Sequence, residues 1–152
     1  MDQQGNNEIF ELKQAARKII EMVKDVRELQ KNLNFYSKSH NSFIIEQYDK
    51  LRAELVEVLR IIQELRENEF DEEDVLTRVE VEKVNAKERE IAQNYEVDAL
   101  IREHKIDSHS ASSLINDITF AQSISKKLLT CAETLWVRDE EMKELGDEYG
   151  YN

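Results

Sequence analysis

From Ile44 to Leu65 the chain reads IIEQYDKLRAELVEVLRIIQEL. Apolar residues recur at every third or fourth position of this stretch, which places them on one side of an α-helix. The residues of this apolar stripe are Ile44, Tyr48, Leu51, Leu55, Val58, Ile62 and Leu65. Because no polar residue interrupts the stripe, it predicts a helix that ends near Glu67 and packs one face against other helices.

Polar capping residues on both sides of this helix predict turns. Residues 37–42 (SKSHNS) form the first turn, since Ser and Asn compete for backbone hydrogen bonds and cap helices. The second turn covers residues 68–71, where Asp71 is followed by acids that suit the first turn of a helix. Residues 105–109 form the third turn, with Asp107 as the cap of the last helix.

These turns leave room for a helix before residue 37 and for another after residue 109. The first, from about residue 7 to 36, carries a stripe with seven-residue spacing: Ile9, Leu12, Ala16, Ile19, Val23, Val26, Gln30 and Leu33. Its opposite, solvated face is charged: Lys13, Arg17, Lys24, Glu28 and Lys31. The last helix, to about Trp136, carries Ala111, Leu114, Ile118, Ala121, Ser125, Leu128, Ala132 and Leu135. The small residues in that set predict a close approach to a neighbouring helix.

The segment from about Glu72 to His104 is the least regular. Leu76 and Val79 begin an apolar stripe, but residues 85–90 (NAKERE) are almost entirely polar. The apolar face then resumes on a rotated line: Ile91, Tyr95, Ala99 and Arg102. We expect a long helix that bends or projects past its neighbours near residues 85–90, and a full break there remains an alternative.

Composition supports an all-α fold. The chain has no proline, and its three glycines lie near the termini, so no strong helix breaker interrupts residues 6–145. Short turns force successive helices to run antiparallel. We predict one domain over residues 7–138, an elongated bundle of about four long helices, followed by an acidic tail over residues 139–152 that frays. Two helical hairpins that dimerise are the alternative arrangement.

The charge and the cysteine usage limit the possible partners and compartment. A net charge of −12 disfavours binding to nucleic acid and to anionic membrane surfaces. No stretch approaches the ~20 apolar residues of a membrane span, so we predict no direct insertion of this segment into a membrane. Cys131 is the only cysteine, which suits the reducing cytoplasm.

The sequence contains no recognisable catalytic site, and we assign no catalytic, cofactor-binding or metal-ligating residue. The Glu-x-x-His pairs of a di-iron bundle are missing. His104 and His109 flank a turn without the spacing that pairs them with Cys131 around zinc, and Cys131 is expected to be a half-buried, inert thiol. Glu21 and Asp25 are four residues apart and are expected to point outward as a solvated pair.

Two further groups of residues are explained by helix capping and by packing. Helix capping accounts for most of the acidic cluster of residues 64–74, although it can also attract cations or a basic partner. Among the aromatic residues, Tyr48 and Trp136 have core spacing. Phe35, Tyr36 and Phe43 bracket the first turn and are expected to close that end of the bundle; an exposed aromatic patch there would instead indicate a partner site.

Four local sequences, in order, give the chain a family resemblance. They are EIFEL at residues 8–12, VRELQKNL at 26–33, EQYDKLR at 46–52 and SSLIND at 112–117. They resemble the cytoplasmic C-terminal tail of bacterial sodium/phosphate cotransporter-family proteins, which is similar to the PhoU fold, a bundle of long helices. Within them LIND at residues 114–117 is the most distinctive.

The resemblance implies a regulatory or accessory domain that follows the membrane spans of a transporter. Its partners would be the transmembrane part of that transporter and a second copy of the domain. PhoU proteins carry repeated acidic motifs of the form Glu/Asp-x-x-x-Asp on two three-helix units. Glu21 to Asp25 fits these letters, but the surrounding sequence differs and there is no second unit, so metal binding does not follow. A stand-alone helical scaffold, a dimerisation module and the tail of a sodium/proton antiporter, which has a turn like residues 105–107, remain alternatives.

Overall fold

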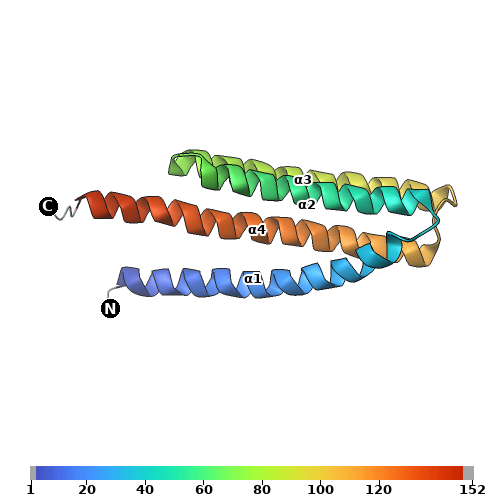
Figure 1. Cartoon of the computed structure of the whole chain (residues 1–152), viewed down its shortest axis with the longest axis horizontal. Coiled ribbons are helices and arrows are strands. Elements are labelled where there is room, and N and C mark those ends of the chain that lie inside the picture. The colour runs from blue at the N-terminus through green and yellow to red at the C-terminus, as the bar shows by residue number, and fades with distance from the viewer. Residues whose placement is uncertain (1–2, 149–152) are drawn as a thin grey trace.

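The computed structural model describes residues 3–148, with side chains for residues 3–137. This part of the chain is all-α and consists of helices joined by short turns, without a strand. The helices are α1 (Gln3–Tyr36), α2 (Ser42–Glu67), α3 (Glu72–Arg102) and α4 (Ser108–Glu148). Each runs antiparallel to the one before it, which produces the elongated up-down bundle that the sequence predicts (Figure 1).

Side-chain caps fix the starts of α2, α3 and α4. Asn41 accepts hydrogen bonds from the backbone N–H groups of Phe43 and Ile44 at the start of α2. Asp71 accepts one from Asp74 N–H at 2.8 Å, and three acids follow it in the first turn of α3. Asp107 accepts one from Ser110 N–H at 2.9 Å. The predicted caps at Asp71 and Asp107 are therefore confirmed, because each satisfies an N–H group that the first helical turn leaves open.

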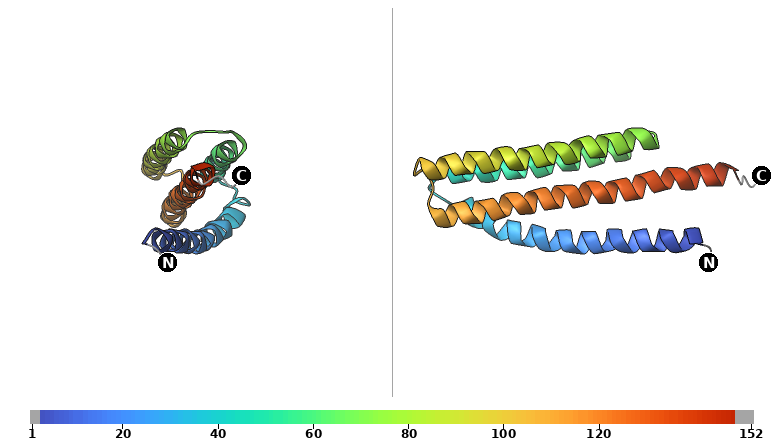
Figure 2. Two further views of the ribbon diagram at one scale, coloured as in Figure 1. Left: turned by 90° about the vertical axis from the view of Figure 1, so that its left-hand side faces the viewer. Right: turned by 180° about the vertical axis from the view of Figure 1, so that it is seen from behind.

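Helix α4 lies at the centre of the molecule. The other helices all pack against it, with α1 on one side and the α2–α3 pair on the other (Figures 1 and 2). Within the described residues α1 and α3 do not meet, and α1 approaches α2 chiefly at their connecting end, where the rings of Tyr36 and Tyr48 stack with centroids 5.0 Å apart. The bundle is thus layered around α4 and does not enclose one core shared equally by all helices.

Two apolar clusters form the core and meet at Leu128 of α4. One joins α1, α2, α3 and α4 near the turns at residues 37–41 and 103–107, and the other joins α2, α3 and α4 at the opposite end. The stripe predicted on α2 is buried or partly buried throughout. On α4 the small residues Ala121, Ser125 and Ala132 are buried, which allows the close approach that the sequence indicates.

The prediction of which face of α1 packs against the bundle is wrong. The side chains that face α4 lie one residue earlier along the helix: Ala15, Met22, Leu29 and Tyr36. Polar pairs with α4 from Asp25 and Asn32 hold this rotation. Most of the predicted stripe therefore remains exposed, including Ile9, Leu12, Ile19, Val23 and Val26 at 41–48% of their surface.

Helix α3 is one long, continuous helix, as the sequence predicts, and the alternative of a full break near residues 85–90 is wrong. Its buried face runs from Val75 to Val97 and includes Glu82, Ala86, Glu90 and Gln93, so residues 85–90 pack within the bundle instead of projecting from it. The polar side chains are buried because they pair with α2 and with one another. As a result Ile91 and Tyr95, predicted to be on the packed face, are exposed.

The end of the chain is more ordered than the sequence suggests. Helix α4 continues through Glu148, so residues 139–148 of the predicted frayed tail are helical. Residues 149–152 of that tail lie outside the described part of the chain. Trp136 is partly buried against the second core cluster, as its spacing predicts.

Candidate functional site

A buried carboxyl group links α1, α2 and α4. Asp117 on α4 is 0% exposed, and its Oδ2 accepts a hydrogen bond of 2.6 Å from the hydroxyl of Tyr48, which is 1% exposed. The amide of Asn32 donates to the other oxygen, Oδ1, at 3.2 Å. Burial raises the pKa of Asp117. Burial and the hydrogen bond to Asp117 both raise the pKa of Tyr48. Tyr48 and Asp117 are closed to solvent and Asn32 is partly buried, so these three side chains clasp the helices together.

Three of the four sequence segments that carry the family resemblance meet at this clasp. Asn32 belongs to residues 26–33, Tyr48 to residues 46–52 and Asp117 to residues 112–117. The sequence predicts Tyr48 in the core and marks Asp117 only as the last residue of the distinctive LIND segment, while nothing in it singles out Asn32. The signal that was available is the position of Asp117, which directly precedes the apolar stripe residue Ile118.

A second polar cluster lies between α2 and α3. The guanidinium group of Arg89 is 2.5 Å from Glu82 and 3.7 Å from Glu54, both of which are buried. Glu90 pairs with Lys87 at 2.5 Å. Burial raises the pKa of Glu54, the positive charge of Arg89 opposes this rise, and the negative charges of Glu82 and Glu90 add to it. One arginine thus serves several carboxylates, which leaves Glu54 the poorly paired member.

A hollow of about 370 Å³ opens beside this cluster. Ala53 of α2 and Ala92 of α3 leave the space, because a methyl group is too short to fill the gap between the helices. The remaining lining residues are Lys50, Glu54, Glu57, Arg89, Gln93 and Glu96. Lys50 pairs with Glu96 and Arg89 pairs with Glu54, so the charges largely compensate one another. No serine, threonine, cysteine or histidine lines the hollow, so the groups there that can transfer a proton are its carboxylates and Lys50.

Of the acidic pair predicted to point outward on α1, Glu21 is exposed but Asp25 is not. Asp25 faces α4, where its carboxylate lies 2.7 Å from the ammonium group of Lys127 and accepts a hydrogen bond from Ser123 at 3.2 Å. Glu21 lies 3.9 Å from the same ammonium group. Because α1 is rotated by one residue from the predicted orientation, this pair holds a lysine and ties α1 to α4.

The histidines and the cysteine lie far apart. Cys131 is buried, not half-buried, between α1 and α4, with its sulfur 3.9 Å from the carbonyl oxygen of Ala15. Burial raises its pKa, which suppresses the reactive thiolate. Helical rise places His109 about 33 Å from Cys131 along α4. Within the described residues no group of three or more His, Cys, Asp or Glu side chains is placed to hold a metal ion.

The acidic cluster at residues 64–74 is engaged locally. Glu64 pairs with Arg78 at 2.6 Å, Glu67 accepts a hydrogen bond from Gln63 at 2.8 Å, and Asp71 caps α3. These contacts agree with a capping and ion-pairing role for this end of the bundle.

The aromatic residues around the first turn only partly close that end. Tyr36 is buried, but Phe35 is exposed and makes an edge-on contact with Tyr36. Phe43 is also partly exposed and lies under the ammonium group of Lys105, which is 5.0 Å from the ring centroid. Of the three aromatic residues predicted to close the bundle, one does so fully.

An apolar row on α1 that the sequence predicts to be buried is exposed in the structure. We call Ile9, Leu12, Ile19, Val23 and Val26 the α1 seam. Its seven-residue spacing is typical of a helix that packs against another helix, yet no helix of residues 3–148 covers it. This row is therefore the principal candidate for an interaction surface.

No protein-family model, curated protein or solved structure matches this chain. None of the helices in the described residues combines the length and the apolar composition that crossing a membrane requires.

Proposed function

We propose that this chain is a non-enzymatic regulatory domain that docks, through the α1 seam, on a helix in the transmembrane part of a sodium-coupled phosphate transporter at its cytoplasmic side. The observation that carries the docking role is the seam: a row of large apolar side chains with helix-packing spacing, half exposed along the outer helix of the bundle. The identity of the partner rests on the resemblance of four sequence segments to the tails of such transporters.

Regulation in this proposal is conformational. A domain that binds one transport state more tightly than another shifts the population toward the favoured state, without any chemistry of its own. Coupling of this kind typically amounts to about 1–3 kcal/mol. The clasp at Asp117 suits such a role, because it fixes α1 relative to α2 and α4 and so presents the seam on a rigid body.

The first test is the genomic reading frame upstream of the codon for residue 1. An open frame that encodes several apolar spans upstream would identify this chain as a transporter tail. The family to which those spans belong would then distinguish a phosphate transporter from a sodium/proton antiporter. A stop followed by a genuine start removes the transporter from the proposal.

The second test changes the seam in the full transporter. Replacing Ile19 and Val26 with glutamine removes two apolar side chains from the seam. Glutamine is a good helix former, so the change does not weaken the helix itself. We expect phosphate uptake to lose its response to external phosphate, while the domain keeps its helical content. The matched control replaces Val81 and Val84 with glutamine on the outer face of α3, where both are similarly exposed. Regulation equal to that of the unmodified transporter in the seam variant contradicts the docking role.

Self-association is a second candidate, favoured by the same seven-residue spacing. In an antiparallel pairing of two seams, however, Lys13 of one copy would face Arg27 of the other, and these like charges oppose the pairing. Light scattering after gel filtration measures the mass directly. A strict monomer at high protein concentration eliminates this candidate and leaves the docking role intact.

A further inference from the structure

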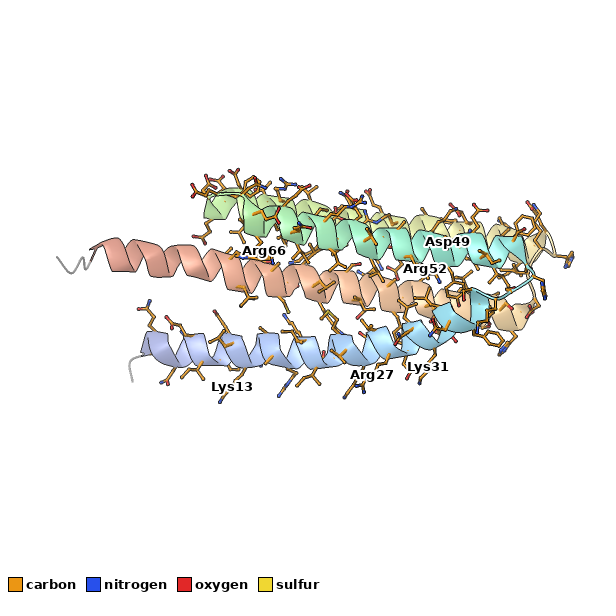
Figure 3. The ribbon with its side chains drawn as sticks, in the orientation of Figure 1. Lys13, Arg27, Lys31, Asp49, Arg52 and Arg66 are labelled. Atoms are coloured by element: carbon orange, nitrogen blue, oxygen red, sulfur yellow. The ribbon has the colours of Figure 1, made fainter. Side chains whose placement is uncertain are left out.

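The outermost side of α1 carries a row of cations that none of the roles above uses. We call Lys13, Arg17, Lys24, Arg27 and Lys31 the basic ridge. Their spacings of three, four and seven residues place them on one side of the helix, and all are exposed. In Figure 3 the side chains of Lys13, Arg27 and Lys31 point away from α4 and toward the outside of the molecule.

The cations of the ridge are largely free of ion pairs. Within residues 3–137, Lys13, Arg17, Lys24 and Arg27 take part in no salt bridge, and Lys31 pairs only with its neighbour Glu28. The other helices behave differently, since every arginine and lysine on α2 and α3 in the described structure is paired with an acid. These pairs involve Lys50, Arg52, Arg60, Arg66, Arg78, Lys83, Lys87, Arg89 and Arg102. Uncompensated positive charge is therefore concentrated on α1 and available to an anionic partner.

Two large apolar side chains are interleaved with these cations. Phe10 and Ile20 are 62% and 60% exposed, more than any member of the α1 seam. Phe10 precedes Lys13 by three residues, and Ile20 lies between Arg17 and Lys24, so both project from the same side as the ridge. Apolar and cationic side chains alternating on one helix face are typical of helices that lie in the interface of an anionic membrane.

The position of α1 allows a flat surface to reach the whole ridge. It forms one outer layer of the molecule, with α4 between it and the α2–α3 pair (Figures 1 and 2). Packed helices lie about 8–10 Å apart, so away from the turn that joins α1 to α2 the α2–α3 pair lies roughly 16–20 Å from the axis of α1. That separation exceeds the Debye length of about 8 Å at physiological salt. The acids of α2 and α3 are thus screened from a surface that touches α1, even though the whole chain has a net charge of −12.

The acids on α1 nearest the ridge are partly neutralised. Glu28 lies 2.6 Å from Lys31, and Glu21 lies 3.9 Å from Lys127 of α4. We propose that the basic ridge binds the anionic headgroups of a membrane surface, with Phe10 and Ile20 entering the headgroup layer. The bundle then lies along the membrane on α1, its acidic helices face away from the lipid, and the α1 seam on the adjacent side of the helix stays open to a protein partner. This lipid contact belongs to the chain itself and does not depend on the transporter proposed above.

The test uses the purified chain and vesicles, with no transporter present. Sedimentation compares vesicles of phosphatidylcholine with vesicles of equal parts phosphatidylcholine and phosphatidylglycerol. We expect binding to the anionic vesicles only, and we expect release at about 1 M salt, where the Debye length is about 3 Å. Equal binding to both vesicle types, or binding to neither, overturns the proposal.

Charge-neutralising variants locate the contact. The double variant Arg17→Gln and Lys24→Gln should bind anionic vesicles about thirtyfold more weakly, from the contribution of each surface cation. The control, Arg60→Gln and Arg102→Gln, loses the same charge from exposed positions on α2 and α3 and should bind as the unmodified chain does. A third variant, Phe10→Ser and Ile20→Ser, distinguishes lipid from other polyanions, and we expect it to bind anionic vesicles more weakly. Unchanged vesicle binding of this variant overturns the lipid assignment. Preferred binding of the unmodified chain to single-stranded RNA or to an acidic helical peptide overturns it as well. Circular dichroism confirms that each variant is folded.

Discussion

Removing a single hydroxyl group from the core should destabilise this bundle measurably. Tyr48→Phe deletes the donor of the 2.6 Å hydrogen bond to Asp117 and leaves a fully buried carboxyl oxygen without that partner. Leaving a buried acceptor unsatisfied costs about 1–3 kcal/mol. Because Asn32 still donates to the other oxygen of Asp117, we place the loss in unfolding free energy at about 2 kcal/mol. For a domain of this size that corresponds to a fall of roughly 4–8 °C in Tm.

Tyr36→Phe is a matched control for this change. The rings of Tyr36 and Tyr48 stack at 5.0 Å and both are buried, but within the described residues the hydroxyl of Tyr36 makes no hydrogen bond. Urea unfolding followed by circular dichroism gives the free energy of each variant. The control should change it by about 0.5 kcal/mol or less. If Tyr48→Phe and Tyr36→Phe have the same stability within 0.5 kcal/mol, the clasp contributes nothing beyond packing and our account of it is wrong.

Two other features give predictions. The raised pKa of Glu54 means that this side chain binds a proton more tightly in the folded chain than in the unfolded chain. The unmodified chain should therefore lose stability relative to Glu54→Gln as the pH rises above the ordinary pKa of a glutamate, and a stability difference in urea unfolding that does not change with pH would refute the assignment. Cys131 should react with a thiol reagent roughly a hundredfold or more slowly in the native chain than in urea, because it is buried and its pKa is raised. In a Val23→Cys variant the added thiol lies on the exposed seam and should react fast. Similar reaction rates at this thiol and at Cys131 in the native state would contradict the buried position of Cys131.

Apolar periodicity predicts helices well where burial is purely apolar. On α2 the stripe from Ile44 to Leu65 faces the core as expected, and on α4 the same holds from Ala111 to Ala132. The turns follow from capping residues such as Asp71 and Asp107, whose effect is local and needs no knowledge of the neighbouring helices.

The same reasoning fails where polar side chains are buried in pairs. On α1 the face toward α4 contains Asp25 and Asn32, which interrupt its apolar pattern, so periodicity predicts that the more regular row beside it is the packed face. On α3 Gln93 is on the buried face because Gln47 of α2 is there to meet it. A residue's partner across the bundle is a tertiary fact, and a single sequence contains no signal that identifies the pair in advance.

The central position of α4 has a consequence for how the chain folds during synthesis. Helix α1 is made first, yet the groups that hold it are made last: Asn32 binds a residue 85 positions later, and the carbonyl of Ala15 meets a thiol 116 positions later. At ordinary rates of translation the nascent α1 waits on the order of ten seconds for α4 to leave the ribosome. Helices α2 and α3 also lack their main packing partner until then. Completion of the bundle is therefore a late event, and a chain truncated before α4 keeps only the limited contacts that α1, α2 and α3 make with one another.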